Sequence, residues 1–554
     1  MIEAWTADEM RAAEKPLLDA GVPLMDRAAR ALARTVLGDI ARRRPAAGMP
    51  RRRVAGSLGS DGLPGEGRVR PARRAGTRAP ARGAAALLLV GAGNNGGDAL
   101  FAGAHLAREG VRVTAVLVAS EVHAAGLAAL RAARAEVIER SELRVPAVVA
   151  RAEAADAVVD GLTGAGSRGA LRPPAGGIVR ALADVRAAAE AAGTPWPWVV
   201  AVDVPSGIGV DDGAVPGPVL PADRTVAFGA YKPGLLLPPA APLAGSVTVT
   251  DVGLGSLQGP QFAGTLRLED DDVAAVLRAP GPRDHKYTRG VVGVVAGTEK
   301  FPGAGVLAAA GAVRAGAGLV RALGPVPVTS QILSRHPEAV TVGGRVQSWV
   351  LGPGIPSDGS DAGQDRRVYG ALAAVTGVLD AEVTGGVVPA VIDAGAMAML
   401  EHRLPEIAVL TPHAGELATL MSGLGHEVTR ADVEAEPVRW ARAAHRATGA
   451  TVLLKGAVTV VVGSGATYAQ ADAPAWLATA GAGDVLAGIL GTLLASRAAD
   501  VLADHALTSR VAAAAVVVHG RAAALASGGG PVTASDVADA VPRVIARILG
   551  GDHA

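Results

Sequence analysis

The sequence predicts an α/β protein of two successive domains, each a three-layer α/β/α structure built on a largely parallel sheet. Short apolar strands alternate with helical segments in two long stretches of the chain, a pattern typical of parallel sheets covered by helices on both faces. Glycine-rich turns directly follow several of these strands, as at residues 91–97 and 350–354. The length of 554 residues is also too great for one hydrophobic core.

The first domain is expected to span residues 1–260. Apolar residues at helical spacing predict a pair of helices at 6–20 and 22–37. Runs of alanine, valine and leucine bounded by turn residues then predict strands. These strands are expected at 85–90, 111–118, 156–160, 198–204 and 247–252.

Residues 41–83 interrupt this pattern with a basic segment rich in glycine, proline and alanine. It holds twelve arginines against only Asp61 and Glu66. Such a segment buries too little apolar surface to offset the entropy cost of ordering, which predicts a disordered insertion. A nucleic acid or another acidic partner is an alternative, although charge runs are usually only solvated.

The second domain is expected to span residues 265–554, after a link rich in glycine. The strand and helix rhythm restarts there, with a helix from about residue 303 and helices again from residue 505. Strands are expected at 291–296, 349–351, 387–393, 407–410, 451–454 and 458–462.

Composition narrows the class of protein. Half of the residues are hydrophobic, yet no uninterrupted apolar run reaches the roughly 18 residues of a membrane span, so we expect a soluble protein with no membrane partner. The opening MIEAWTADEM lacks the layout of a signal peptide, which favours the cytoplasm. The absence of cysteine excludes disulfides, thiolate zinc sites and cysteine nucleophiles. The formal net charge of +1 makes nucleic-acid binding unlikely for the chain as a whole.

Three motifs of the first domain fall at successive strand ends. They are NNGGD at 94–98, VVDGLTGAG at 158–166, which includes Asp160, and VDVPSGI at 202–208, which includes Asp203 and Ser206. Each alone is better explained as turn chemistry. Together they predict one crevice, because the carboxyl ends of parallel strands line the ligand site of an open sheet.

The motif TAGAGD, residues 479–484, is the most informative of the second domain. Its glycines expose several backbone N–H groups at the start of a helix, an arrangement suited to a phosphate in transfer, and they set Asp484 beside it. The alternative is an ordinary helix capped by aspartate. Four further turns follow predicted strands. They are GPG at 352–354, VIDAGAM at 391–397, whose strand ends on Asp393, TPHAGE at 411–416 and Lys455-Gly456.

Two side chains in these turns have competing interpretations. Lys455 is one of only five lysines, and a phosphate role and a surface charge are equally acceptable for it. His413 is a candidate general base, but a histidine in a Pro-His turn more often orients hydrogen bonds.

The first-domain motifs, with AFGAYKPGLL at 227–236, resemble the epimerase domain of the NAD(P)H-hydrate repair family, which implies a Rossmann-like fold. The opening helices resemble that family's N-terminal pair. The resemblance places the dinucleotide substrate on the glycine turn, on the loop after the third strand and on Asp203, a candidate for proton handling. The implied substrate-binding residues are Asn94, Asn95, Gly96, Gly97, Asp98, Gly164, Ala165, Gly166, Ser167, Arg168, Gly169, Ala170 and Asp203.

The same resemblance implies a potassium ion in the first domain. Its ligands correspond to Asn95, Asp160 and Ser206. Amide, carboxylate and hydroxyl oxygens are suitable donors for such a hard cation.

The second-domain turns, in their order, resemble the ribokinase-like NAD(P)H-hydrate dehydratases. By this resemblance the hydrate contacts Ala304, Gly352, His413, Glu416 and Asp484. The nucleotide, ADP or ATP, lies with Mg²⁺ against Lys455, Gly456, Ala457, Val458, Thr459, Thr479, Ala480, Gly481, Ala482 and Gly483. Two positions depart from the family pattern: Ala482 replaces a frequent threonine, and Gly395 replaces a frequent aspartate that orients a metal.

The resemblance implies a bifunctional enzyme that repairs the hydrates of NADH and NADPH. The first domain interconverts the R and S epimers, and the second dehydrates the S form through a phosphorylated intermediate, with Asp484 as the base. Likeness to bacterial fused forms favours ADP over ATP and a homo-oligomer of four or more chains. A small-molecule kinase fused to a nucleotide-binding module is the alternative.

Overall fold

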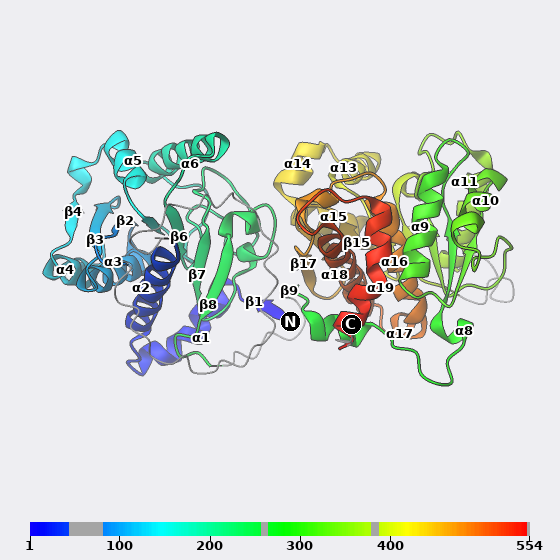
Figure 1. Ribbon diagram of the computed structural model, residues 1–554, viewed down its shortest axis with the longest axis horizontal. Coiled ribbons are helices and arrows are strands. Elements are labelled where there is room, and N and C mark those ends of the chain that lie inside the picture. The colour runs from blue at the N-terminus through cyan, green and yellow to red at the C-terminus, as the bar shows by residue number, and fades with distance from the viewer. Residues whose placement is uncertain (44–80, 256–263, 378–386, 551–554) are drawn as a thin grey trace. The chain divides into compact units, whose positions relative to one another are not determined.

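The computed structural model describes residues 1–43, 81–255, 264–377 and 387–550. It divides into two compact units, Glu3–Pro260 and Gln261–Ala554, with Met1–Ile2 grouped with the second (Figure 1). Each unit has one central sheet between two layers of helices, which confirms the predicted α/β/α class.

The first unit contains a seven-stranded sheet in which all neighbouring strands are parallel. Its strand order is β4-β3-β2-β5-β6-β7-β8. The strands are β2 (Ala85–Val90), β3 (Arg112–Leu117), β4 (Glu136–Ile138), β5 (Ala157–Gly161), β6 (Trp198–Val202), β7 (Arg224–Phe228) and β8 (Ser246–Thr250). The order reverses between β2 and β5, and ligands of open α/β sheets bind at such a switch point.

Two apolar clusters hold the helices of this unit on opposite faces of the sheet. One cluster joins α2, α3 and α4 to alternate residues of β2 and β6, and the other joins α5 and α6 to the residues between them. The helices are α1 (Ala7–Asp19), α2 (Leu24–Arg43), α3 (Gly93–Arg108), α4 (Ala124–Ala132), α5 (Val145–Glu153) and α6 (Ala175–Ala192).

Helix α2 is longer than the sequence predicts. It continues through residues 38–43, because buried Asp39 accepts hydrogen bonds from Trp198 Nε1 and Arg224 Nε, both at 3.0 Å. Residues 41–43 therefore belong to the helix and not to the predicted insertion. Residues 81–83 form a turn before β2. The rest of the predicted disordered insertion, residues 44–80, lies outside the described residues.

The second unit contains a ten-stranded mixed sheet. Its strand order is β1-β9-β17-β16-β15-β14-β13-β12-β10-β11, parallel from β11 to β15 and antiparallel across β15, β16 and β17. The strands are β1 (Ile2–Ala4), β9 (Thr265–Arg267), β10 (Val291–Val295), β11 (Leu319–Ala322), β12 (Ser348–Leu351), β13 (Ala390–Ile392), β14 (Ala408–Leu410), β15 (Thr451–Leu454), β16 (Thr459–Val462) and β17 (Thr467–Gln470).

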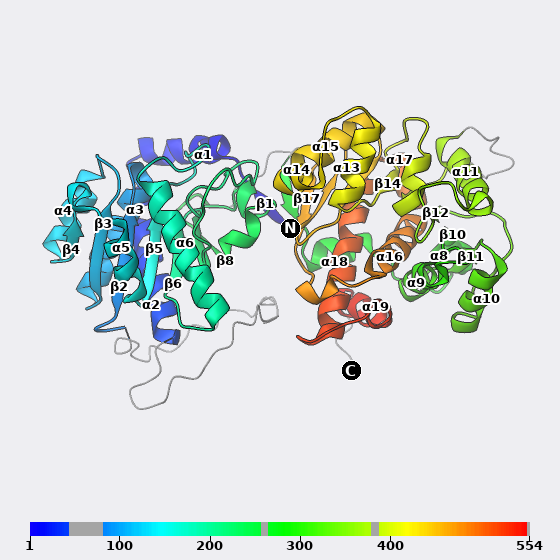
Figure 2. The ribbon, with the colours of Figure 1, turned by 90° about the horizontal axis from the view of Figure 1, so that it is seen from above.

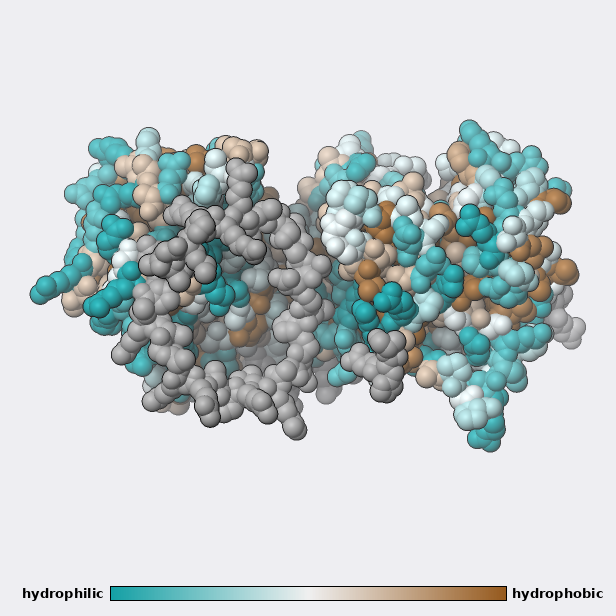
Figure 3. Space-filling model, viewed as in Figure 1, coloured by the Kyte–Doolittle hydropathy of each residue, from teal (hydrophilic) through white to brown (hydrophobic). Residues whose placement is uncertain are grey.

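Helices cover both faces of this sheet, with α13 and α15 on one side and α9 and α19 on the other (Figure 2). Over α9, Figure 3 shows apolar and polar side chains interspersed on the surface. The helices are α7 (Asp270–Val276), α8 (Lys286–Arg289), α9 (Pro302–Arg314), α10 (Val326–Arg335), α11 (Ala362–Thr376), α13 (Ala414–Gly423), α14 (Arg430–Ala435), α15 (Pro437–Thr448), α16 (Ala482–Ser496), α17 (Ala498–Ala503), α18 (Leu507–Ser527) and α19 (Ala534–Ile548).

Helix α18 is the one helix among the described residues that is long and apolar enough to cross a membrane by length and composition. In the structure 72% of its apolar window is buried, and it packs against α16, α19 and the sheet. Its hydrophobicity is therefore explained by its place in the core.

Helices α9 and α16 pack along a seam of glycines. A Cβ on Gly488 of α16 would overlap the carbonyl oxygen of Ala308, and one on Gly311 of α9 would overlap that of Val485. Thr492 Oγ1 donates to the Ala312 carbonyl across the same seam at 3.0 Å. The seam fixes α16, whose first turn carries Asp484.

We predict that Gly488→Ala destabilises the second unit by about 2 kcal/mol, because a methyl group there forces α9 and α16 apart. Gly370→Ala is the matched control, since Gly370 is exposed on α11 with no atom within 4 Å of an added Cβ. The control should gain roughly 0.5 kcal/mol from a better helix former. Denaturant unfolding of both variants measures the difference, and equal stability of the two would contradict the packing argument.

Candidate active sites

The glycine motif of the first unit lies at the start of α3, at the switch point of the sheet. Residues 94–98 form the first turns of that helix instead of the loop that the sequence predicts. The helix begins here because Gly96 lies against Gly91 so closely that any Cβ would overlap the Gly91 carbonyl. The first N–H groups of a helix lack partners within the helix, so this terminus is of the kind that binds anions.

The three residues predicted to bind potassium are brought together around Thr163. Buried Asp160 accepts hydrogen bonds from Ser206 N at 2.8 Å and Ser206 Oγ at 2.7 Å. Ser206 Oγ accepts from Thr163 N at 2.9 Å, and Asn95 Nδ2 donates to the Thr163 carbonyl at 2.9 Å. Burial raises the pKa of Asp160, while the hydrogen bonds from Ser206 and Leu162 oppose that shift.

The loop after β5 lies on the other side of this crevice. Gly164 packs on Asn95, since a Cβ there would lie 2.9 Å from Asn95 Oδ1. Residues 166 and 168–170 are exposed, whereas Ala165 and Ser167 are half-buried. The loop therefore begins beside Asn95, and its residues from 168 to 170 are exposed to solvent.

A cluster of charged side chains lies behind the glycine motif. Asp203 follows β6 in the left-handed region, with a φ of 65°, and accepts a hydrogen bond from Phe228 N at 3.1 Å and an ion pair from Lys232. Burial, then the charges of Asp203 and Glu14, raise the pKa of Asp98 well above its ordinary value. Asp98 Oδ1 is buried and has no hydrogen-bond partner.

In the second unit, Lys455 connects three of the predicted turns. Its backbone N–H donates to the Pro412 carbonyl at 2.8 Å, which holds the TPHAGE turn beside the end of β15. Its Nζ lies 2.9 Å from Asp393 Oδ1 and 3.6 Å from Glu416 Oε2. These carboxylates raise the pKa of Lys455 against the opposing effect of desolvation, and the half-buried side chain is a paired ammonium and not a free surface charge.

Asp484 faces this lysine from the first turn of α16. Burial raises the pKa of Asp484 to about 7, and the charges of Asp393 and Glu416 add to the shift while Lys455 opposes it. Gly481 precedes the helix with a φ of 84°, and a Cβ on Gly483 would lie 3.4 Å from Lys455 Nζ. A carboxylate that titrates near neutral pH is suited to general base catalysis.

The remaining predicted hydrate contacts surround this group. His413 Nδ1 accepts hydrogen bonds from the N–H groups of Gly415 and Glu416 at 3.0 and 3.1 Å, so the imidazole caps α13. Of the two interpretations of this histidine, the capping agrees with a group that orients hydrogen bonds. Gly352, with a φ of 105°, has Asp393 and Ala396 against it, and Ala304 lies beside Gly354.

The predicted nucleotide segments lie beside the same lysine. Gly456 and Ala457 are exposed at the tip of the β15–β16 hairpin, whereas the side chains of Val458 and Thr459 are buried. Before α16, Ala480 is exposed and Thr479 is half-buried; in its first turn, Ala482 is buried and Gly483 is half-buried. The backbone of Ala482 forms a hydrogen bond with the buried side chain of His519 on α18.

Five residues of these two sites were not among the predicted site residues. They are Glu14, Thr163, Lys232, Asp393 and His519. Only two carried a usable signal: Lys232 is one of five lysines, and Asp393 ends a predicted strand. His519 resembles an ordinary core histidine in an apolar helix, and burial lowers its pKa to about 4.

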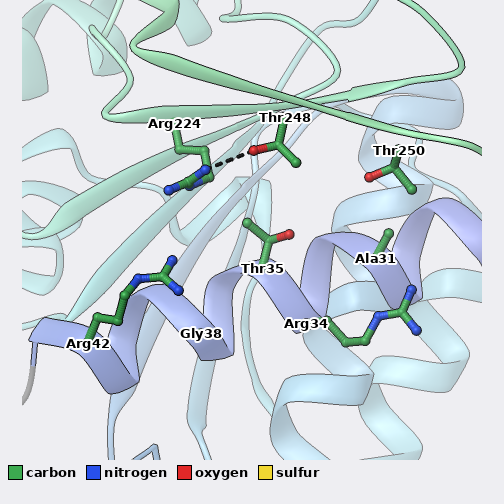
Figure 4. A pocket seen from close by; sticks show the side chains of 8 residues that line it. All are labelled: Ala31, Arg34, Thr35, Gly38, Arg42, Arg224, Thr248 and Thr250. Carbon is green, nitrogen blue, oxygen red and sulfur yellow. Dashed lines mark hydrogen bonds between the residues drawn. The ribbon is translucent and has the colours of Figure 1, made fainter. Parts of the chain in front are cut away.

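A separate hollow between α2, β7 and β8 is lined by none of the predicted site residues (Figure 4). Arg224 donates to Thr248 Oγ1 there at 2.8 Å. Arg42 and Arg224 both pair with Asp39, and Arg34 is a third arginine of the lining.

Comparison with known proteins decides the family. A family model described as NAD(P)H-hydrate dehydratase matches residues 292–543, and one described as YjeF-related protein N-terminus matches residues 22–234. The bifunctional NAD(P)H-hydrate repair enzyme Nnr of Mycobacterium tuberculosis is 39% identical over 421 residues, which cover 74% of this chain and 78% of that relative. The chain belongs to the bifunctional NAD(P)H-hydrate repair enzymes.

Two further similarities involve one unit each. The NAD(P)H-hydrate epimerase of Clavibacter sepedonicus is 42% identical over 257 residues, covering 46% of this chain and 91% of the relative. The ADP/ATP-dependent NAD(P)H-hydrate dehydratase of Bacillus subtilis, co-crystallised with ATP and Mg²⁺, is 24% identical, covering 50% of this chain and 97% of that structure, with a TM-score of 0.42.

The two metal ions expected in this repair enzyme are potassium and Mg²⁺, and the side chains offer different ligands to each. For potassium, Thr163 joins the oxygens of Asn95, Asp160 and Ser206, and its own buried Oγ1, which has no hydrogen-bond partner among the described residues, adds a further oxygen ligand. For Mg²⁺, no group of three or more acidic or histidine side chains forms a cage within the described ranges. An ion held mainly by nucleotide phosphates fits this better. At residue 395 an aspartate has no room, because a Cβ there would overlap the Ile355 carbonyl.

We predict that Asp484→Asn stabilises the second unit at pH 8 by roughly 2–4 kcal/mol. The folded pKa of about 7 lies above the unfolded value, so folding binds a proton between about pH 4 and 7, and wild-type stability falls as pH rises through that window. The amide cannot ionise and escapes this loss. Unfolding of both proteins at pH 5 and pH 8 tests the sign: a stability difference that does not grow with pH refutes it.

Proposed function

We propose that the second unit dehydrates the S hydrates of NADH and NADPH at the expense of ADP or ATP, with Asp484 as the base. The observation that carries the proposal is the position of Asp484. It faces the Lys455 ammonium across the glycine turn that opens α16, and burial sets its pKa at about 7. The expected base, a half-buried cation and the backbone N–H groups of the glycine turn lie close together.

The chemistry follows from that arrangement. Asp484 takes the proton of the hydrate's hydroxyl while its oxygen attacks the terminal phosphorus of the nucleotide, and the bond to the bridging oxygen breaks. The phosphorylated hydrate then expels phosphate as the ring nitrogen supplies electrons. Loss of a proton from the neighbouring ring carbon restores the dihydronicotinamide.

The surrounding groups stabilise charge during the transfer. The N–H groups of residues 481–483 and the helix α16 terminus face the transferred phosphoryl group. Lys455 supplies a positive charge held in place by Asp393 and Glu416. Mg²⁺ on the phosphates would neutralise further negative charge.

The first unit, in this proposal, interconverts the R and S hydrates. The glycine start of α3 receives the dinucleotide phosphates, the loop 164–170 covers them, and Asp203 handles the proton. The combination of both units has a chemical reason, because an enzyme specific for one epimer leaves the other unused. Likeness to bacterial fused forms favours ADP as the phosphate donor.

The central test mixes the purified chain with both hydrate epimers, Mg²⁺ and either ADP or ATP. Absorbance of the reduced cofactor should reappear, faster with ADP. Asp484→Asn should lower that rate at least about 1,000-fold while epimer exchange continues. A stable phosphorylated product without cofactor recovery would instead identify a small-molecule kinase, and loss of both activities in a folded variant would contradict the division of labour.

The pH dependence gives an independent prediction. Because Asp484 must be ionised to act as a base, kcat/KM for dehydration should fall about tenfold for each pH unit below its pKa of about 7 and level off above it. Epimer exchange assayed without nucleotide is the control. A dehydration rate that is flat from pH 5.5 to 8.5 would exclude Asp484 as the base.

A further inference from the structure

The hollow between α2, β7 and β8 is a cavity of the first unit that neither proposed activity uses (Figure 4). Its volume is about 320 Å³, which lies within the range of sites for small molecules. Basic and hydroxyl side chains dominate its lining. They are Arg34, Arg42 and Arg224, with Thr35, Thr248 and Thr250.

The hollow is open because both the helix and the sheet carry short side chains at this point. β8 is the edge strand of the sheet, and Thr248 and Thr250 lie on one face of it, two residues apart. Ala31, Thr35 and Gly38 have the spacing of one helix face and line the opposite wall. The large apolar residues of α2 pack instead on β6 and β7, so space for a ligand is left beside β8.

Three guanidinium groups surround this space, and one carboxylate offsets them. Buried Asp39 accepts a hydrogen bond from Arg224 Nε at 3.0 Å and pairs with Arg42. Arg34 has no ion-pair partner within the part of the chain that the structure describes. Three positive charges and one negative charge leave a net charge of +2 around the hollow. Gathering like charges is unfavourable, and an anion between them relieves the repulsion.

Arg224 is already held in position at the wall of the hollow. Its Nε is bonded to Asp39, and its Nη1 donates to Thr248 Oγ1 at 2.8 Å. Asp39 in turn accepts from Trp198 Nε1 at 3.0 Å. A guanidinium carries more N–H donors than these two bonds use, so a ligand can bind Arg224 without breaking either of them.

We propose that the hollow binds a small phosphorylated polyol of the sugar-phosphate class. The guanidinium groups hold the phosphate, because their planar N–H pairs match its oxygens. The hydroxyls of Thr35 and Thr250 have no hydrogen-bond partner among the described residues, and they bind the ligand's own hydroxyls. None of the residues that line the hollow is aromatic, so a nucleotide base finds no stacking surface there. The site is separate from both proposed activities.

Calorimetric titration of the full chain with ribose 5-phosphate tests the site. Arg34→Gln removes the unpaired, exposed guanidinium, and the Kd should rise at least about tenfold. Arg30→Gln is the matched control, because Arg30 is one helical turn earlier on α2, is exposed and pairs with Asp26 outside the lining. The control should bind as wild type does. Both variants lose the same charge, so equal weakening would reveal only a general electrostatic effect and overturn the proposal.

The parts of the ligand are tested separately. Ribose should not bind, and inorganic phosphate should bind at least about threefold more weakly than the ester. Thr250→Val should weaken binding of the ester but not of inorganic phosphate. Equal affinity for the ester and for inorganic phosphate overturns the polyol assignment.

Two further outcomes decide the location of the site. Absence of binding to wild type up to about 10 mM ribose 5-phosphate overturns the proposal, as does unchanged binding by Arg34→Gln, which would place the ligand elsewhere. Epimer exchange and dehydration by Arg34→Gln should match wild type, which also checks that the variant is folded. Loss of either activity in a folded variant would overturn the separation of this site from the active sites.

Discussion

The ion pair between a lysine and a carboxylate at the carboxyl edge of a parallel sheet is the interaction on which both candidate sites depend. Each unit contains one such lysine, Lys232 in the first and Lys455 in the second, in a chain that otherwise uses arginine for most of its positive charge. An ammonium at such a point offsets the cost of collecting carboxylates there.

The sheets supply the placement that this interaction needs. In the first unit α3 and the loop after β5 leave the two sides of the switch point, which brings the predicted substrate and ion residues Asn95, Asp160 and Ser206 together from distant segments. In the second, the ends of β13, β14 and β15 stand side by side, and they set Asp393, Glu416 and Lys455 within a few ångströms. Neither site needs a long loop to reach its partners.

The sequence predicted most strands and the motifs that follow them, because apolar runs and glycine turns are local signals. It also identified Asp484 and the TAGAGD turn, whose residue types are informative without neighbours. Lys232, Glu14 and His519 were missed because their roles come from partners more than 25 residues away in the chain. Gly395 shows the same limit: the departure from the family pattern is visible in sequence, but its cause is the Ile355 carbonyl that occupies the space.

The glycine seam between α9 and α16 has a consequence for the reach of Asp484, the proposed base. At Gly311 and Gly488 backbone lies against backbone along that seam, which limits how far α16 can move relative to α9. The distance from the helix to the substrate must then be matched by the side chain at position 484 alone. A glutamate would overshoot by one methylene that the scaffold cannot absorb, so the seam makes the length of the aspartate, and not only its charge, a requirement of the site.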